Sequence, residues 1–176
     1  KQGAQVELVT GPTAQKAVHP NIHRTDIESA QEMYDAATRL FPNADIAILS
    51  AAVADYRPAQ QADIKLKKQG DSGMTLELVQ TPDILATLGK MKQDYQTLIG
   101  FALETNNELE HAKLKLKKKN LDFIVLNSLR DEGAGFNYDT NKVTIIQRNG
   151  PQQHYPLKSK AEVATDIVDT LCQLWK

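Results

Sequence analysis

The chain has 176 residues, of which 41% are hydrophobic and 24% are charged, and its formal net charge is −1. These values are typical of one globular domain and give no overall attraction to nucleic acid or to an anionic membrane. The single cysteine, Cys172, excludes a disulfide within the chain and favours a reducing compartment, so we expect a cytoplasmic protein. No apolar run reaches the roughly 18 residues that a membrane span requires.

The first part of the chain predicts alternating strands and helices. Weak alternation at 6–9 and a short apolar stretch at 22–24 indicate strands. A helix capped by Thr25 or Asp26 should follow and end at Pro42, and the apolar run 45–49 indicates a buried strand.

Small residues then dominate the stretch 50–58, which reads SAAVADYRP. Ser50, Ala51 and Ala52 leave the backbone accessible, and Asp55 follows them. In an open α/β sheet, the loop after the carboxyl end of a strand is where ligands bind. The stretch on its own is equally compatible with a turn that packs a helix against the sheet.

Residues 62–80 predict a β-hairpin. The segments 64–68 and 74–79 alternate between apolar and polar residues, and the polar turn 69–73 separates them. A two-stranded ribbon is only marginally stable alone. We therefore expect this hairpin to act as a flap or as a dimer arm.

The second half of the chain completes the predicted sheet. Thr81 should cap a helix with Pro82 at its first position, and buried strands are expected at 97–102 and 121–126 around a helix ending near Lys119. A hairpin around Asn149-Gly150 and a helix capped by Ser159 should follow. We expect one domain, 1–176, with a Rossmann-like doubly wound α/β fold: a mainly parallel sheet, a protruding β-hairpin arm and a C-terminal β-hairpin plus helix.

Lysines are the strongest chemical signal. Lys115 and Lys119 are four residues apart and share a helix face, which suits a polyphosphate at the edge of the sheet. Lys65 on the hairpin could close over it as a mobile counter-charge. Lysines at a helix end are also often only a solvated face that matches the helix dipole. The chain has no P-loop and no GxGxxG motif, and its four histidines lack metal-ligand spacing.

Six short motifs in order give the chain a specific resemblance. They are AAVADYRP at 51–58, IKLKK at 64–68, TPDIL at 81–85, GFALET at 100–105, KNLD at 119–122 with Asn127, and GFN at 135–137. From about Val6 onward the chain resembles the phosphopantothenoylcysteine synthetase family, the synthetase half of a bifunctional bacterial coenzyme A biosynthesis flavoprotein. That family carries an upstream strand, a glycine-rich turn and an asparagine-bearing segment before the point where this sequence begins, so we expect a fragment.

This resemblance implies a phosphopantothenate–cysteine ligase. CTP and Mg²⁺ would activate the carboxylate of 4′-phosphopantothenate as an acyl-cytidylate, and cysteine would then form the amide and release CMP. Lys65 would be catalytic, and the magnesium ligands cannot be placed. The family pattern assigns the nucleotide site to Ala51, Ala52, Asp55, Lys65, Thr81, Pro82, Asp83, Ile84, Phe101, Lys115 and Lys119.

The resemblance also implies partners. A homodimer through the 62–80 hairpin is expected, together with a fused or associated flavin-dependent decarboxylase domain. Two alternatives remain open: an NAD(P)-binding Rossmann-type oxidoreductase, although the glycine fingerprint is absent, and a non-catalytic nucleotide-binding module.

Overall fold

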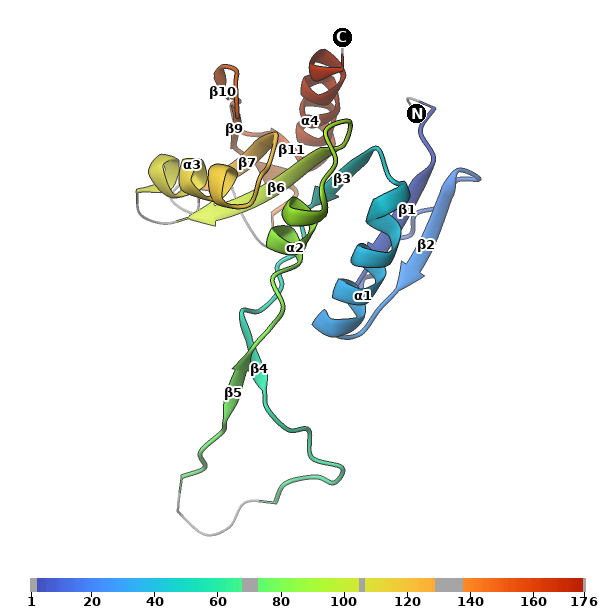
Figure 1. The fold of residues 1–176 in the computed structure, drawn as a ribbon, viewed down its shortest axis with the longest axis vertical. Helices are drawn as coiled ribbons and strands as arrows, with labels where there is room; N and C mark the ends of the chain where they lie inside the picture. The colour runs from blue at the N-terminus through green and yellow to red at the C-terminus, as the bar shows by residue number, and fades with distance from the viewer. Residues whose placement is uncertain (1–2, 68–72, 105–106, 129–137, 176) are drawn as a thin grey trace. The chain divides into compact units, whose positions relative to one another are not determined.

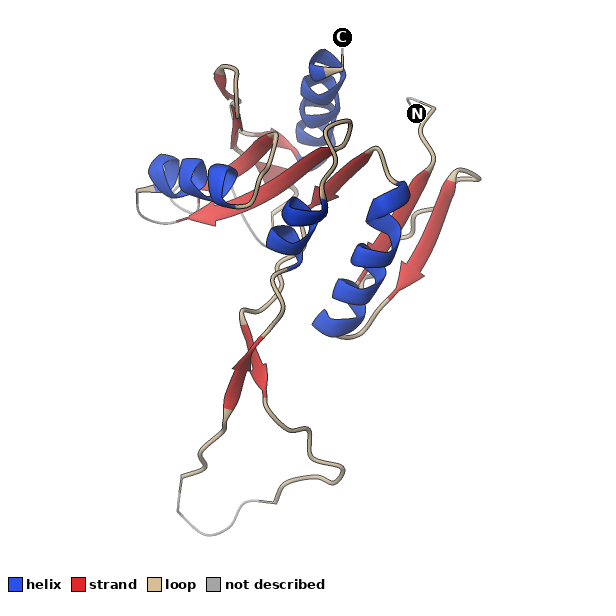
Figure 2. Cartoon of the chain, viewed as in Figure 1, coloured by secondary structure: helices blue, strands red, loops and turns tan. Residues whose placement is uncertain are grey.

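The computed structural model describes residues 3–67, 73–104, 107–128 and 138–175 (Figures 1 and 2). The chain divides into two compact units. The first unit comprises residues 1–40 and 51–84, and the second unit comprises residues 41–50 and 85–176. None of the helices in the described ranges has both the length and the apolar character needed to cross a bilayer.

The first unit contains a parallel pair of strands, β1 (Val6–Thr10) and β2 (Ile22–Asp26), with helix α1 (Ala30–Leu40) next in the chain. Thr25 and Asp26 were expected to cap this helix, but both belong to β2. The Ser29 hydroxyl instead accepts a hydrogen bond from the Glu32 N–H at 3.2 Å, so the helix begins at the next residue.

The first unit contains a hairpin arm, but its paired strands lie outside the segments that were expected to pair. Strand β4 (Tyr56–Pro58) pairs antiparallel with β5 (Leu78–Gln80). The expected strands are not formed in the described parts of 64–68 and 74–77, and most of the expected turn, 68–72, lies outside the described residues. Ile64, Leu66 and Met74 are exposed, so alternation there has no apolar surface against which to pack.

The second unit contains a five-stranded sheet in the order β10-β9-β7-β6-β3. Its strands are β3 (Ile46–Leu49), β6 (Thr97–Glu104), β7 (Phe123–Ser128), β9 (Val143–Gln147) and β10 (Gln152–His154). The first three are parallel, and β9 and β10 add the predicted antiparallel hairpin. A single helical turn, η1 (Phe41–Asn43), precedes β3, and the short strands β8 (Thr140–Asn141) and β11 (Lys158–Ser159) pair separately.

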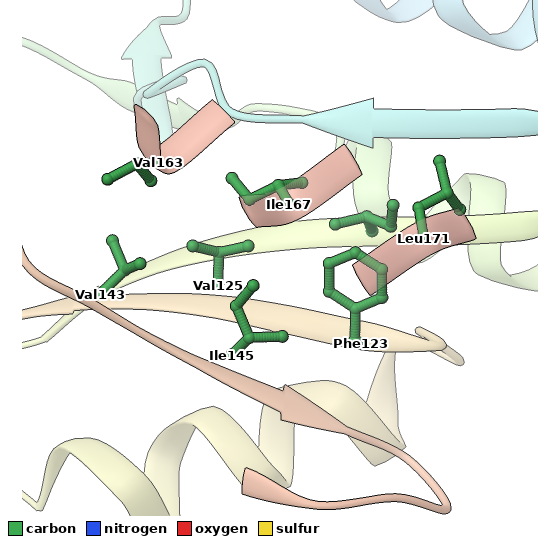
Figure 3. Packing of buried hydrophobic residues seen from close by; sticks show 8 residues of the cluster. Phe123, Val125, Val143, Ile145, Val163, Ile167 and Leu171 are labelled. Atoms are coloured by element: carbon green, nitrogen blue, oxygen red, sulfur yellow. The ribbon is translucent and has the colours of Figure 1, made fainter. Parts of the chain in front are cut away.

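Three helices accompany this sheet: α2 (Ile84–Met91), α3 (Glu108–Lys118) and α4 (Lys160–Leu174). The main core lies between one face of the sheet and α4 (Figure 3). Its buried residues are Ile99, Phe123, Val125, Val143, Ile145, Val163, Ile167 and Leu171. The predicted α/β fold with a mostly parallel, Rossmann-like sheet is confirmed.

The predicted cap of α4 is also confirmed. The Ser159 hydroxyl accepts a hydrogen bond from the Glu162 N–H at 3.2 Å, and the Glu162 carboxylate accepts one from the Ser159 N–H at 2.9 Å. Hydrogen bonds from the Ser159 hydroxyl and N–H lower the pKa of Glu162 below its ordinary value. This reciprocal cap fixes the start of the helix that covers the core.

Asp122 joins three elements at the amino-terminal end of the parallel strands. Its carboxylate accepts the Leu98 N–H of β6 at 2.7 Å and the Lys92 ammonium at 2.6 Å, directly after α2. Its backbone carbonyl accepts the Arg148 N–H that follows β9 at 2.8 Å. The Lys92 side chain is only 9% exposed, so removing its counter-ion would leave a mostly buried charge.

Replacing Asp122 with alanine should therefore lower the free energy of unfolding by about 3 kcal/mol or more. The control is Asp26→Ala, which breaks an ion pair with Arg24 whose Asp26 side chain is 67% exposed and should cost less than about 1 kcal/mol. Urea denaturation monitored by circular dichroism measures both. Equal losses in the two variants would contradict the anchoring role of Asp122.

Candidate functional site

Phe101 and Lys115 lie together in the second unit. Beyond the Leu49–Gly100 pair, β3 has ended and β6 continues beside β7 alone. The Lys115 ammonium, on α3, donates a hydrogen bond to the Phe101 carbonyl oxygen of β6 at 2.9 Å. Both residues are half-buried. A cation is thus held against the part of β6 that extends toward its carboxyl end, where ligands bind in open α/β sheets.

Lys119 directly follows α3, one helix turn after Lys115. Helix α3 runs back from the carboxyl end of β6 to the start of β7, so its last turn lies at the amino-terminal side of the sheet. There the Lys119 backbone packs closely against Gly89 in α2, and the Lys119 N–H donates to the Lys115 carbonyl oxygen at 3.0 Å. Lys115 and Lys119 therefore share one helix turn, but their backbones are at different depths along the sheet.

The small-residue stretch 50–58 leads into the base of the arm in the first unit. Ala51, Ala52 and Asp55 are exposed. The Asp55 carbonyl oxygen accepts the Thr81 N–H at 2.8 Å, which places the loop beside the 81–84 segment. These two stretches, predicted separately as parts of one site, are adjacent at their backbones.

The cap predicted at Thr81 is not formed as expected, because α2 begins at Ile84. The residue before a proline is restricted to extended conformations, so Thr81 continues the direction of β5 and Asp83 comes directly before the helix. The Thr81 hydroxyl oxygen is buried and has no hydrogen-bond partner among the described residues. Ile84 is only 6% exposed, so its side chain belongs to the packing and only its backbone remains available to a ligand.

The predicted site residues divide between the two units. Phe101, Lys115 and Lys119 belong to the second unit, and the first unit carries Ala51, Ala52, Asp55, Lys65, Thr81, Pro82, Asp83 and Ile84. Lys65 is exposed on the arm, consistent with a side chain free to reorient.

Asn127 is a candidate binding residue that sequence reasoning noticed only as part of a motif. It follows Val125 by two residues on β7, so it lies on the same face of the sheet beyond the core, paired with Leu103 and Val143. Its side-chain oxygen is buried, and none of the described residues donates a hydrogen bond to it. A buried acceptor without a partner costs about 1–3 kcal/mol, and a ligand that donated a hydrogen bond to it would remove that cost. The sequence signal was an amide at the end of a buried strand.

Two shallow hollows lie elsewhere in the second unit. One of about 350 Å³ is on the outer side of α3, between Leu109 and Lys117. The other, of about 650 Å³, is at the amino-terminal edge of the sheet and is lined by Asp45, Asp94 and Asp122 with Arg148. Within the described ranges, no three histidine, cysteine or acidic side chains are grouped as metal ligands.

Residues 1–174 match the family model described as the C-terminal domain of DNA/pantothenate metabolism flavoproteins. A prokaryotic protein of unknown organism, named cysteine/cysteine sulfinic acid decarboxylase, is 48% identical over 98% of the chain and 48% of its own length. The coenzyme A biosynthesis bifunctional protein CoaBC of Bacillus subtilis is 42% identical over 99% of the chain and 42% of its own length. The chain thus spans about half the length of the curated relatives it matches.

Solved structures agree with this match. The crystal structure of the C-terminal domain of a CoaBC protein has 41% identity and a TM-score of 0.78, over 98% of this chain and 77% of that one. A DNA/pantothenate metabolism flavoprotein from Streptococcus pneumoniae has a TM-score of 0.80 over 99% of this chain and 82% of that one. Its identity is 22%, so that likeness shows the fold alone.

The comparisons correct the function expected from the sequence. The activity that the 48% identical relative names is a decarboxylation, and the family is described as flavoproteins. The expected CTP-using ligase, its classification as a synthetase, and Mg²⁺ and CTP as cofactor and co-substrate are therefore not supported. The short motifs had identified the protein family, but they had been assigned to the synthetase activity.

A flavin is the cofactor that the family description implies, and neither of the two hollows in the second unit fits one. Flavin mononucleotide needs a deep, mostly apolar slot and cationic or N–H partners for its phosphate. The 650 Å³ hollow is open, and its lining of three carboxylates and one guanidinium, that of Arg148, gives no excess of positive charge for that phosphate. The 350 Å³ hollow lies on the surface of one helix. Neither hollow provides the enclosure that an isoalloxazine ring requires.

The unpartnered oxygen of Asn127 predicts that Asn127→Leu leaves the stability unchanged or raises it, because Leu removes a buried acceptor at similar volume. The matched control is Gln96→Leu. Gln96 is 3% exposed and donates to the carbonyl oxygens of Phe41 and Ala44, so its loss should cost about 2 kcal/mol or more. Urea denaturation compares them, and a loss in Asn127→Leu as large as in Gln96→Leu would show that the folded chain itself satisfies Asn127.

Proposed function

Because the chain belongs to the family of C-terminal domains of DNA/pantothenate metabolism flavoproteins, we propose that it is the substrate-binding C-terminal domain of a coenzyme A biosynthesis decarboxylase. The observation that carries this proposal is the 48% identity, over 98% of the chain, to a relative named for decarboxylating cysteine and cysteine sulfinic acid. The family description adds the pantothenate side of the substrate. The ligand that combines both is 4′-phosphopantothenoylcysteine.

The site in the second unit suits the chemistry of this ligand. Its phosphate and its cysteine carboxylate are anions, which the ammonium of Lys115 can bind by charge-assisted hydrogen bonds. The amide N–H and hydroxyl groups of the ligand are hydrogen-bond donors. The buried side-chain oxygen of Asn127 has no donor among the described residues and can accept from one of these ligand groups. Phe101 contributes its backbone carbonyl oxygen to this site, while its side chain packs against the core that α4 covers. These residues bind and orient a ligand, and none of them supplies the chemistry of decarboxylation.

We assign that chemistry to a flavin held by a fused domain outside this chain. The relatives are about twice as long, and neither hollow of the second unit fits a flavin. In the first unit, Ala51, Ala52, Asp55 and the 81–84 segment remain proposed ligand contacts, and Lys65 remains a proposed cationic contact. In the second unit, Lys119 remains a proposed cationic contact. A cytoplasmic location likewise remains a proposal.

Binding of 4′-phosphopantothenoylcysteine tests this function. Isothermal titration calorimetry should show binding by the wild-type chain and a loss of about tenfold or more in Lys115→Gln, because a charged hydrogen bond contributes about 1.5–3 kcal/mol. The control is Lys113→Gln on the exposed side of α3, which should bind as the wild type does. In the full-length protein, the same compound should release CO₂. No binding by the wild-type chain, or equal losses in both variants, would refute the proposal.

We also propose a homodimer formed through the 62–80 arm. Apolar side chains are exposed along both of its sides, with Ile64 at 79%, Leu66 at 61%, Met74 at 67% and Leu76 at 57% exposure. Exposure of this kind on a narrow ribbon is characteristic of an unfilled interface. A second arm of the same sequence would cover these side chains.

The dimer proposal predicts that the double substitution Ile64→Asp and Leu76→Asp gives a monomer while the rest of the chain stays folded. Sedimentation velocity at micromolar concentration measures the association, and circular dichroism measures the fold. Lys67→Asp, a charged change at an exposed polar position on the same arm, is the control and should leave the dimer intact. Monomeric wild-type protein at these concentrations would rule the arm out as an interface.

A further inference from the structure

We infer that Asn120 is a positioning residue for the Lys115 ammonium, acting through a contact between the ends of helices α2 and α3. This inference rests on the proposed function in one respect, since it takes Lys115 to be a ligand-binding group. Asn120 itself does not touch the ligand. Its role follows from a continuous series of contacts that begins at its backbone and ends at β6.

The backbone of Asn120 ends α3 in a left-handed conformation, with φ at 54°. Its N–H donates to the Lys117 carbonyl oxygen at 3.2 Å, and the Leu121 N–H donates to the Leu116 carbonyl oxygen at 3.0 Å. This pair of bonds is the Schellman motif, whose left-handed position is usually glycine and less often asparagine. The backbone alone would favour glycine here, so the asparagine side chain needs a separate explanation.

That explanation is a contact with α2. The Asn120 side-chain amide donates to the Gly89 carbonyl oxygen at 2.9 Å. Gly89 is itself close against the end of α3, because a Cβ at that position would lie 2.9 Å from the Lys119 carbonyl carbon. The two helix ends therefore meet backbone to backbone at Gly89, and Asn120 fastens them with one hydrogen bond.

The fastened turn includes Lys115. The Lys119 N–H donates to the Lys115 carbonyl oxygen at 3.0 Å, which closes the last turn of α3 onto Lys115. From that turn the Lys115 side chain reaches β6, where its ammonium donates to the Phe101 carbonyl oxygen at 2.9 Å. Helix ends fray unless other contacts hold them. When a helix turn moves, the ammonium of a long lysine side chain on that turn is no longer held in one position. Asn120 holds this turn against α2 and so fixes the backbone position from which the Lys115 side chain extends.

The experiment is Asn120→Gly in the full chain, because glycine keeps the left-handed cap and removes only the side-chain bond. We expect its affinity for 4′-phosphopantothenoylcysteine, measured by calorimetry, to fall about twofold to tenfold, because the variant loses one neutral hydrogen bond that orients a binding group. We also expect faster hydrogen exchange at the Lys119 amide. The matched control is Asn107→Gly at the other end of α3, which is also left-handed, at φ 46°, and forms no side-chain cap bond; it should change neither quantity.

A double-substitution cycle separates positioning from general stability. If Asn120 acts through Lys115, adding Asn120→Gly to Lys115→Gln should lower the affinity no further, because the two residues share one effect. Additive losses, an unchanged affinity in Asn120→Gly, or an unchanged exchange rate at Lys119 would each overturn this inference. If Lys115→Gln itself binds normally, the proposed function fails, and this inference fails with it. Normal binding by Asn120→Gly beside a defective Lys115→Gln refutes the positioning role alone.

Discussion

The second unit depends on the carboxylate of Asp122. One short side chain accepts hydrogen bonds from the start of β6 and from Lys92 just after α2, and its own carbonyl holds the chain after β9. The amino-terminal ends of the parallel strands are thereby fixed by polar bonds that are mostly out of solvent. The core between the sheet and α4 then extends from this fixed end toward the opposite edge. That opposite edge can be irregular and polar, because the register of the strands does not depend on it.

The elements that the sequence predicted well are those whose signal is local or core-directed. The strands around Ile99 and Val125 are continuous apolar runs, and the α4 start carries both Ser159 and Glu162, so each could be located within a few residues. The paired strands of the arm were misplaced because alternation of apolar and polar residues indicates only that one face of a segment is to be buried. It does not indicate which part of the chain that face packs against. Ile64 and Leu66 alternate, but the described chain offers them nothing to pack against.

Prediction of the candidate site from the sequence was limited for a similar reason, because packing could not be read from local patterns. The spacing of Lys115 and Lys119 correctly placed them one helix turn apart, but the hydrogen bond from the Lys115 ammonium to the Phe101 carbonyl oxygen depends on how α3 packs on the sheet. Asn127 was visible only as an asparagine closing a strand, since whether a buried oxygen has a partner is a property of the packed structure. The function was harder still to predict. The motifs identify a family of two-domain proteins. Knowing which half of the protein a motif belongs to does not by itself identify the reaction.

Asn127 has a consequence for how this family can vary. A position whose oxygen is buried without a partner is one where random substitution by an apolar residue makes the folded chain more stable. A lineage that kept the fold but no longer used the ligand would therefore be expected to lose the asparagine early, and to gain stability in doing so. If Asn127 binds the proposed ligand, the residue at position 127 would distinguish copies of this domain that keep that binding from copies that keep only the fold.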